Sequence, residues 1–114
     1  MKFYLTVIMI FALTVSSFAS SYSGYITRIY TRPDKNLILL SVEGYNDAVI
    51  SQPACNTNTS FQYAFDPTTP AGMVTLSTVL AALNSELPVS IKGSGICSVY
   101  SSIENLLLLN VSKR

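Results

Sequence analysis

The sequence contains no histidine, and charged residues make up 11% of its 114 positions. Without histidine, Ser-His-Asp and Cys-His catalysis, histidine metal sites and histidine proton shuttles are excluded. The chain also lacks a phosphate-binding loop, and its six acidic residues are scattered rather than grouped as a calcium loop requires. We therefore expect a protein that is not an enzyme and that binds no metal or other cofactor.

An excess of charge of one sign is also missing. The chain has 7 basic and 6 acidic residues, and removal of Lys2 with a leader peptide would leave six of each. Nucleic-acid binding needs a clear basic excess, so this balance argues against a nucleic-acid partner. The many Ser, Thr, Asn and Tyr residues predict a polar, uncharged surface, which suits a protein or sugar partner better.

One apolar run stands out, at the N-terminus. Residues 5–15 are apolar and follow Lys2, and Ser17 and Ala19 supply the small residues that a signal peptidase reads. The run is too short to span a bilayer comfortably, and no later run is long enough to do so. We expect residues 1–19 to be a signal peptide and residues 20–114 to form one exported domain, secreted or periplasmic, without a membrane span.

Cysteine is scarce, but both copies lie in the exported part. Cys55 and Cys97 form an even pair in an oxidising compartment, which predicts a disulfide. The bond would close a loop of about 43 residues, worth roughly 4 kcal/mol in the chain-entropy model. A redox-active thiol is disfavoured because the C-x-x-C spacing is absent.

One segment has helical periodicity. Its apolar residues recur three and four positions apart: Met73, Leu76, Val79, Leu80 and Leu83. Thr69 is placed to cap the first turn, and Pro70 occupies the first helical position, where its missing N–H costs nothing. Pro88 ends the pattern, so a helix is predicted from Pro70 to Leu87.

The rest of the mature chain alternates as strands do. Five strands are predicted, over residues 23–30, 37–43, 61–65, 89–92 and 103–111. Ile26 and Ile29 would fall on opposite faces, which a bulge or strong coil in the first strand would reconcile. The predicted fold is mainly β with one helix, and its order β-β-β-α-β-β matches a five-stranded OB-fold barrel; a generic α+β two-layer fold is the alternative.

The last predicted strand is apolar on both faces. Strict alternation points Ile103, Leu107, Leu109 and Val111 toward the core. Leu106 and Leu108 then lie on the opposite face, which needs cover from a neighbouring subunit or from the chain's own helix or loops.

Three stretches of this sequence resemble a family of small exported OB-fold proteins. They are Ser23-Gly24-x-Ile26; Val42-Glu43-Gly44 with Ala54-Cys55; and Phe65-Asp66-Pro67 through Thr69-Pro70-Ala71-Gly72 to Gly93-x-Gly95-x-Cys97. The family includes the B subunits of subtilase cytotoxin and typhoid toxin. The resemblance implies a homopentameric ring, a catalytic A subunit as partner and sialylated host glycans as ligands. It also implies that Ser23 matches the serine that contacts the sialic acid carboxylate and that Glu43 matches an acidic residue of the same site, while Lys92 occupies the region of a family aromatic.

Sugar binding is also physically reasonable for these residues. Aromatic rings stack on the C–H faces of pyranoses, and hydroxyls and carboxylates bind their OH groups. Tyr22, Ser23 and Tyr25 start the first strand, and Glu43 and Tyr45 follow the second, so all five are expected at one edge of the barrel. The alternatives are that the tyrosines are core or interface residues and that the protein is an exported OB-fold module that binds protein rather than glycan.

Overall fold

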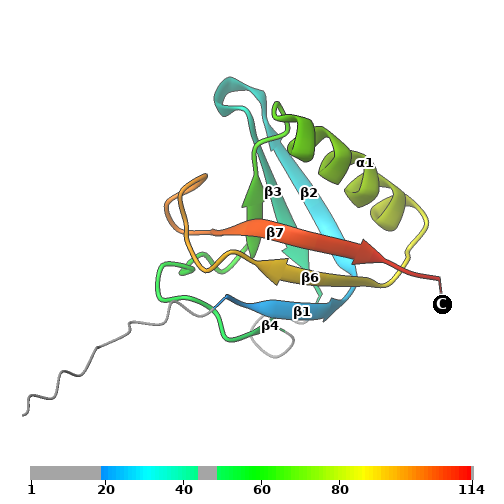
Figure 1. Cartoon of the computed structure of the whole chain (residues 1–114), viewed down its shortest axis with the longest axis horizontal. Coiled ribbons are helices and arrows are strands. Elements are labelled where there is room, and N and C mark those ends of the chain that lie inside the picture. Colours follow the sequence, from blue (N-terminus) through cyan, green and yellow to red (C-terminus); the bar gives the residue numbers. More distant parts are fainter. Residues whose placement is uncertain (1–18, 44–48, 114) are drawn as a thin grey trace, which may run out of the picture.

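The structure, a computed structural model, describes residues 19–43 and 49–113. Most of the predicted signal peptide (residues 1–18) and the predicted site residue Tyr45 lie outside the described residues. The strands are β1 (Ser21–Gly24), β2 (Ile26–Arg32), β3 (Leu37–Val42), β4 (Val49–Ile50), β5 (Tyr63–Phe65), β6 (Val89–Gly93) and β7 (Glu104–Val111). They form one sheet in the order β2-β3-β5-β7-β6-β1-β4, and the helix α1 (Pro70–Asn84) contacts β2 and β7 (Figure 1).

The predicted mainly β fold with one helix is confirmed. The sheet is mixed, because β5 and β7 run parallel while the other ladders are antiparallel. It differs from the predicted five strands in two respects. The first strand is split in two, and β4 lies in a segment expected to be a loop. Among the described residues no ladder joins β2 to β4, the two ends of the strand order.

The split of the first strand occurs at Tyr25. Its backbone N–H donates to the Tyr22 hydroxyl (2.7 Å), which in turn donates to the Tyr25 carbonyl oxygen (3.0 Å). The Tyr22 side chain therefore satisfies the Tyr25 N–H, while the Tyr25 carbonyl oxygen also accepts the backbone N–H of Glu43 (3.0 Å). The pairing with β3 shifts register between Ile26 and Arg28, so the expected irregularity is present.

The β2–β3 hairpin forms as predicted. Its turn is a short 3-10 helix, Pro33–Lys35, followed by Asn36 in the left-handed conformation (φ 50°) that asparagine tolerates. In β3, Ile38 and Leu40 join the core cluster on one face and Leu39 joins a second cluster on the other. Burial on both faces explains why this strand is almost entirely apolar.

The helix begins as predicted but ends earlier. The Thr69 hydroxyl accepts a hydrogen bond from the Gly72 N–H (2.9 Å), which is the expected N-cap. Helix α1 stops at Asn84 rather than Leu87, because Glu86 adopts a left-handed conformation (φ 52°) and the Leu87 N–H returns to the Ala82 carbonyl (3.0 Å). This return bond closes the helix in the manner of a Schellman motif.

The predicted apolar stripe of the helix is confirmed in part, because Val79 is buried and Leu76 and Leu83 pack against the core. Met73 and Leu80 were expected in the core but are 56% and 50% exposed. The buried positions are Gly72, Val79 and Ala82. The reason is a close approach: a Cβ at Gly72 would clash with the carbonyl oxygen of Asp66, so the helix presents its smallest residue there.

The predicted facing of the last strand is also partly wrong. Leu106 packs against the core, and Leu107 is 60% exposed. The register of β7 against β6 shifts between Lys92 and Gly93, which pair with Leu108 and Leu106, so Leu107 is an extra residue. This bulge reverses the alternation on its N-terminal side, and Leu107 and Leu108 both face outward.

The core has a larger and a smaller cluster. The larger contains Tyr22, Ile26, Ile38, Leu40, Val42, Tyr63, Phe65, Val79, Ala82, Val89 and Ile91. The smaller contains Leu37, Leu39, Phe61, Ala64 and Ile103. The predicted Cys55–Cys97 disulfide is confirmed, with the two Cα atoms 6.1 Å apart.

Candidate functional site

The first candidate site is the outer face of β1, β6 and β7. Strand pairing sets it out in two rows: Ser23, Ser90 and Asn110 form one, and Ser21, Lys92 and Leu108 form the other. Directly paired residues have Cβ atoms about 4.5–5.5 Å apart. These six side chains therefore make one continuous surface, which we call the outer face.

The outer face offers hydrogen-bond donors and one positive charge. Ser23, Ser90, Lys92 and Asn110 are exposed, because Tyr22, Val89 and Ile91 take the alternate positions and point into the core. Within the described part of the chain, the Ser23 and Ser90 hydroxyls and the Lys92 ammonium have no partner. Hydroxyls, an amide and an ammonium are groups that bind sugar hydroxyls and a carboxylate.

The second candidate is a pocket of about 450 Å³ beside the end of α1. It is lined by Tyr25, Ile26, Thr27, Glu43, Leu83 and Glu86. Two carboxylates and no cationic side chain line this pocket. Such a site repels the carboxylate of a sialic acid and suits a neutral or cationic group.

The predicted glycan residues therefore fall in separate places. Ser23 and Lys92 lie on the outer face, while Tyr25 and Glu43 line the acidic pocket. Tyr22 is 3% exposed and belongs to the core. Burial is the main reason that its pKa is raised, and the nearby negative charge of Glu43 adds to the effect. The Tyr22 ring supports the bend at Tyr25 rather than offering a stacking surface.

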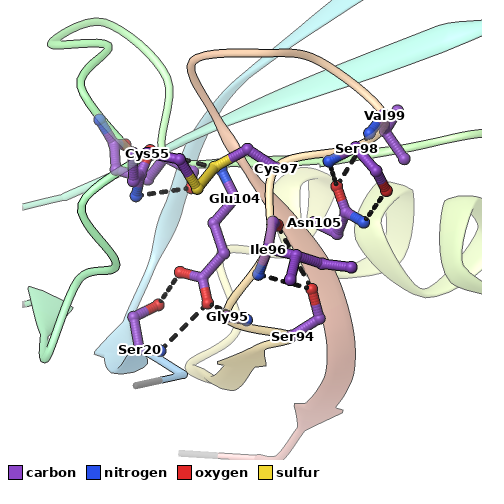
Figure 2. Close-up of a disulfide and its surroundings, with 12 residues drawn as sticks. Ser20, Cys55, Ser94, Gly95, Ile96, Cys97, Ser98, Val99, Glu104 and Asn105 are labelled. Atoms are coloured by element: carbon purple, nitrogen blue, oxygen red, sulfur yellow. Dashed lines mark hydrogen bonds between the residues drawn. A yellow bond between two sulfur atoms is a disulfide. The ribbon is translucent and has the colours of Figure 1, made fainter. Parts of the chain in front are cut away.

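Sequence reasoning missed two acidic residues that matter for these sites. Glu86 faces the pocket of Glu43, but the two are distant in the chain and no local pattern connects them. Glu104 is fully buried at the start of β7, where its carboxylate accepts hydrogen bonds from Ser20 and Gly95 (Figure 2). The sequence signal for Glu104 was the presence of an acidic residue directly after Ile103 in an apolar strand.

The cluster around Glu104 extends to a buried tyrosine. The hydroxyls of Tyr63 and Ser20 are 2.8 Å apart, and the Ser20 hydroxyl donates onward to Glu104. Burial raises the pKa of Tyr63 to about 12, and the negative charge of Glu104 contributes further, against a lowering by the Ser20 hydrogen bond. Tyr63 is thus protonated at neutral pH, which suits a structural hydrogen bond.

In residues 19–43 and 49–113, no group of three or more Cys, Asp or Glu side chains is placed to hold a metal ion. None of the helices in that part of the chain has the length and apolar character needed to cross a membrane. Comparisons of the chain with protein-family models, with curated proteins and with solved structures found no match.

Proposed function

We propose that this protein is an exported, non-catalytic OB-fold module that binds an acidic, sialic acid-type glycan on the outer face. Ser23 and Ser90 would donate to the glycan carboxylate or hydroxyls, and Lys92 would neutralise the carboxylate. Following the resemblance to toxin B subunits, the module would act as a ring of five copies that carries a catalytic partner.

The OB-fold assignment is supported by the continuity of β1 and β2. Only Tyr25 separates these two strands, although they occupy distant positions in the strand order. Counted as one bent strand, they pair with β3 on one side and with β6 on the other. Without the two-residue β4, five strands then remain, with the helix between the third and the fourth, as in a small Greek-key barrel.

The observation that carries the ligand proposal is the register Ser23–Ser90 and Ser21–Lys92. It places three hydroxyls next to one ammonium on adjacent strands, and none of the six outer-face residues is acidic. The acidic pocket has the opposite electrostatic character, so the outer face is the better site for an anionic sugar.

The test is a glycan array probed with the multivalently labelled mature protein. We expect binding to sialylated glycans, with loss of at least tenfold in signal for Lys92→Ala and a clear reduction for Ser23→Ala. Ser77→Ala is the matched control, because its exposed hydroxyl contacts only the Met73 carbonyl of its own helix. Sialoside binding that both outer-face variants leave intact would refute this site.

The alternative is a module that binds protein rather than glycan. It is favoured by Leu107 and Leu108, which expose 60% and 57% of their surface on neighbouring positions of β7. Native mass measurement separates these hypotheses in part. A mass of five chains supports the ring, whereas a monomer without glycan binding favours a heterologous protein partner.

A further inference from the structure

The buried carboxylate of Glu104 is surrounded by donors. The Ser20 backbone N–H lies 3.1 Å from its Oε2 atom, the Gly95 N–H lies 2.8 Å from the same atom, and the Ser20 hydroxyl donates to Oε1. The Tyr63 hydroxyl donates to the Ser20 oxygen in this arrangement. Three donors converge on the Glu104 carboxylate, and the Tyr63 hydroxyl supports one of them. This is the environment of an ionised carboxylate, which only accepts hydrogen bonds.

This carboxylate has no countercharge among the described residues. Their one ion pair joins Arg32 to Asp34 on the β2–β3 hairpin. A buried charge is strongly destabilising unless an opposite charge compensates it. The hydrogen bonds leave the negative charge of Glu104 uncompensated, although its side chain is fully buried.

The missing charge is available from the chain itself. The sequence predicts signal-peptide cleavage after Ala19, which is exposed, whereas Ser20 is 1% exposed. Hydrolysis of the Ala19–Ser20 peptide bond consumes one water and yields a carboxylate on Ala19 and an α-ammonium on Ser20. The nitrogen that gains the charge is the atom already 3.1 Å from Glu104 Oε2.

We propose that leader cleavage creates a buried ion pair between the α-ammonium of Ser20 and the carboxylate of Glu104. The pair fastens the start of β1 to the start of β7 and to the loop after β6. The Ser20 carbonyl also accepts the Gly93 N–H (3.0 Å), so the first residue of the mature chain is held at both its ends. Cleavage by a signal peptidase thereby supplies the positive charge that the buried Glu104 carboxylate lacks.

The surroundings are shaped for this pair. A Cβ at Gly93 would clash with the Glu104 carboxylate, so a side chain at this position would displace the carboxylate from its hydrogen bonds. Two residues beyond Gly95, the Cys97 disulfide holds the same loop (Figure 2). The position of the carboxylate is therefore fixed from the side of β6 as well as from β7.

The test begins with the protein secreted with its own leader. Intact mass is expected to correspond to residues 20–114, with Ser20 first. A second form carries Gly-Gly inserted between Ala19 and Ser20, which moves the charge away and leaves an amide at Ser20. Each form is also made with Glu104→Gln, with Glu86→Gln as the matched control at an exposed glutamate.

We expect the Gly-Gly insertion to lower Tm by about 10 °C or more in the wild-type and Glu86→Gln backgrounds. In the Glu104→Gln background the same insertion should have a much smaller effect, because the partner charge is gone. An equal loss in all three backgrounds would overturn the proposal, as would a mature N-terminus other than Ser20.

A second measurement covers the case in which Glu104→Gln does not fold. The pKa of the α-amino group is measured on the unmodified, ¹³C- and ¹⁵N-labelled wild-type protein, from the pH dependence of the Ser20 Cα and Cβ NMR shifts. An ion pair with Glu104 raises its pKa above the ordinary value of about 7.7–8.0. A value at or below this range contradicts the proposal. The inference requires export but not glycan binding, so these results and the glycan array can fail separately.

Discussion

Two buried regions of this protein are stabilised by different interactions, apolar packing in one and hydrogen bonds in the other. Beneath α1, the core is apolar, and Val79 and Ala82 of the helix pack on the sheet. Around Glu104, the buried groups are polar, and Ser20, Tyr63 and Gly95 are joined by hydrogen bonds. No buried side-chain nitrogen or oxygen among the described residues lacks a partner. Apolar packing is non-directional, whereas a buried polar cluster requires every donor to be matched.

The largest expected effect concerns the disulfide on the polar side. Replacing Cys55 and Cys97 together with serine should lower the free energy of unfolding by about 4 kcal/mol. The corresponding fall in Tm, measured by circular dichroism, is about 15 °C or more. Reduction of the wild-type protein should give the same Tm as the double variant. Cooperative unfolding at an unchanged Tm in either case would show that the hydrogen bonds around Glu104 suffice without the covalent link.

An intermediate effect is expected at alkaline pH, again on the polar side. The folded pKa of Tyr63, about 12, lies above the unfolded value of 10.0. The unfolded state loses this proton first, so stability is retained below pH 10 and falls by about 2 to 3 kcal/mol as pH rises to 12. Urea unfolding between pH 9 and 12 measures the slope. Tyr63→Phe should flatten it, leaving the smaller contribution of Tyr22, whose pKa is also raised; an identical slope in this variant would contradict the assignment.

The smallest effect is expected at the helix cap on the apolar side. Thr69→Ala removes the acceptor of the Gly72 N–H and should cost about 1 kcal/mol of unfolding free energy. Thr69→Ser keeps the hydroxyl and should remain within a few tenths of the wild type. If both variants lose the same amount, packing of the threonine methyl rather than capping is responsible. Urea denaturation provides the measurement.

Sequence patterns predicted the structural features that depend on residue types and their spacing in the chain. The cap at Thr69, the hairpin turn before Asn36 and the cysteine pair follow from residue types and spacing, and all three are present. The facing of α1 was wrong only at Met73 and Leu80, because it also depends on contact between Gly72 and the Asp66 backbone, which spacing within the helix does not encode. The facing of Leu106 was wrong because a single bulge against β6 reverses the alternation.

The candidate site was predictable only in part for the same reason. Ser23 and Lys92 were named separately, but their common surface arises from the register of β1 against β6. Strand alternation assigns a face to each residue and leaves the register between distant strands open. Glu104 was missed because its partners come from positions 20 and 95, and a lone acid in a strand does not reveal them.

The pairing of β1 with β6 has a consequence for the order in which the chain folds. Residues 21–24 form a ladder with residues 89–92, so the first strand of the fold must wait for one of the last. The hairpin of β2 and β3 closes over a short turn and is free to form early. Nonlocal strand pairing of this kind slows folding to about milliseconds to seconds. A nascent chain that carries its hairpin but not yet residues 89–92 would therefore hold β1 without its main partner, and the sheet would be completed only after residues 89–92 have emerged.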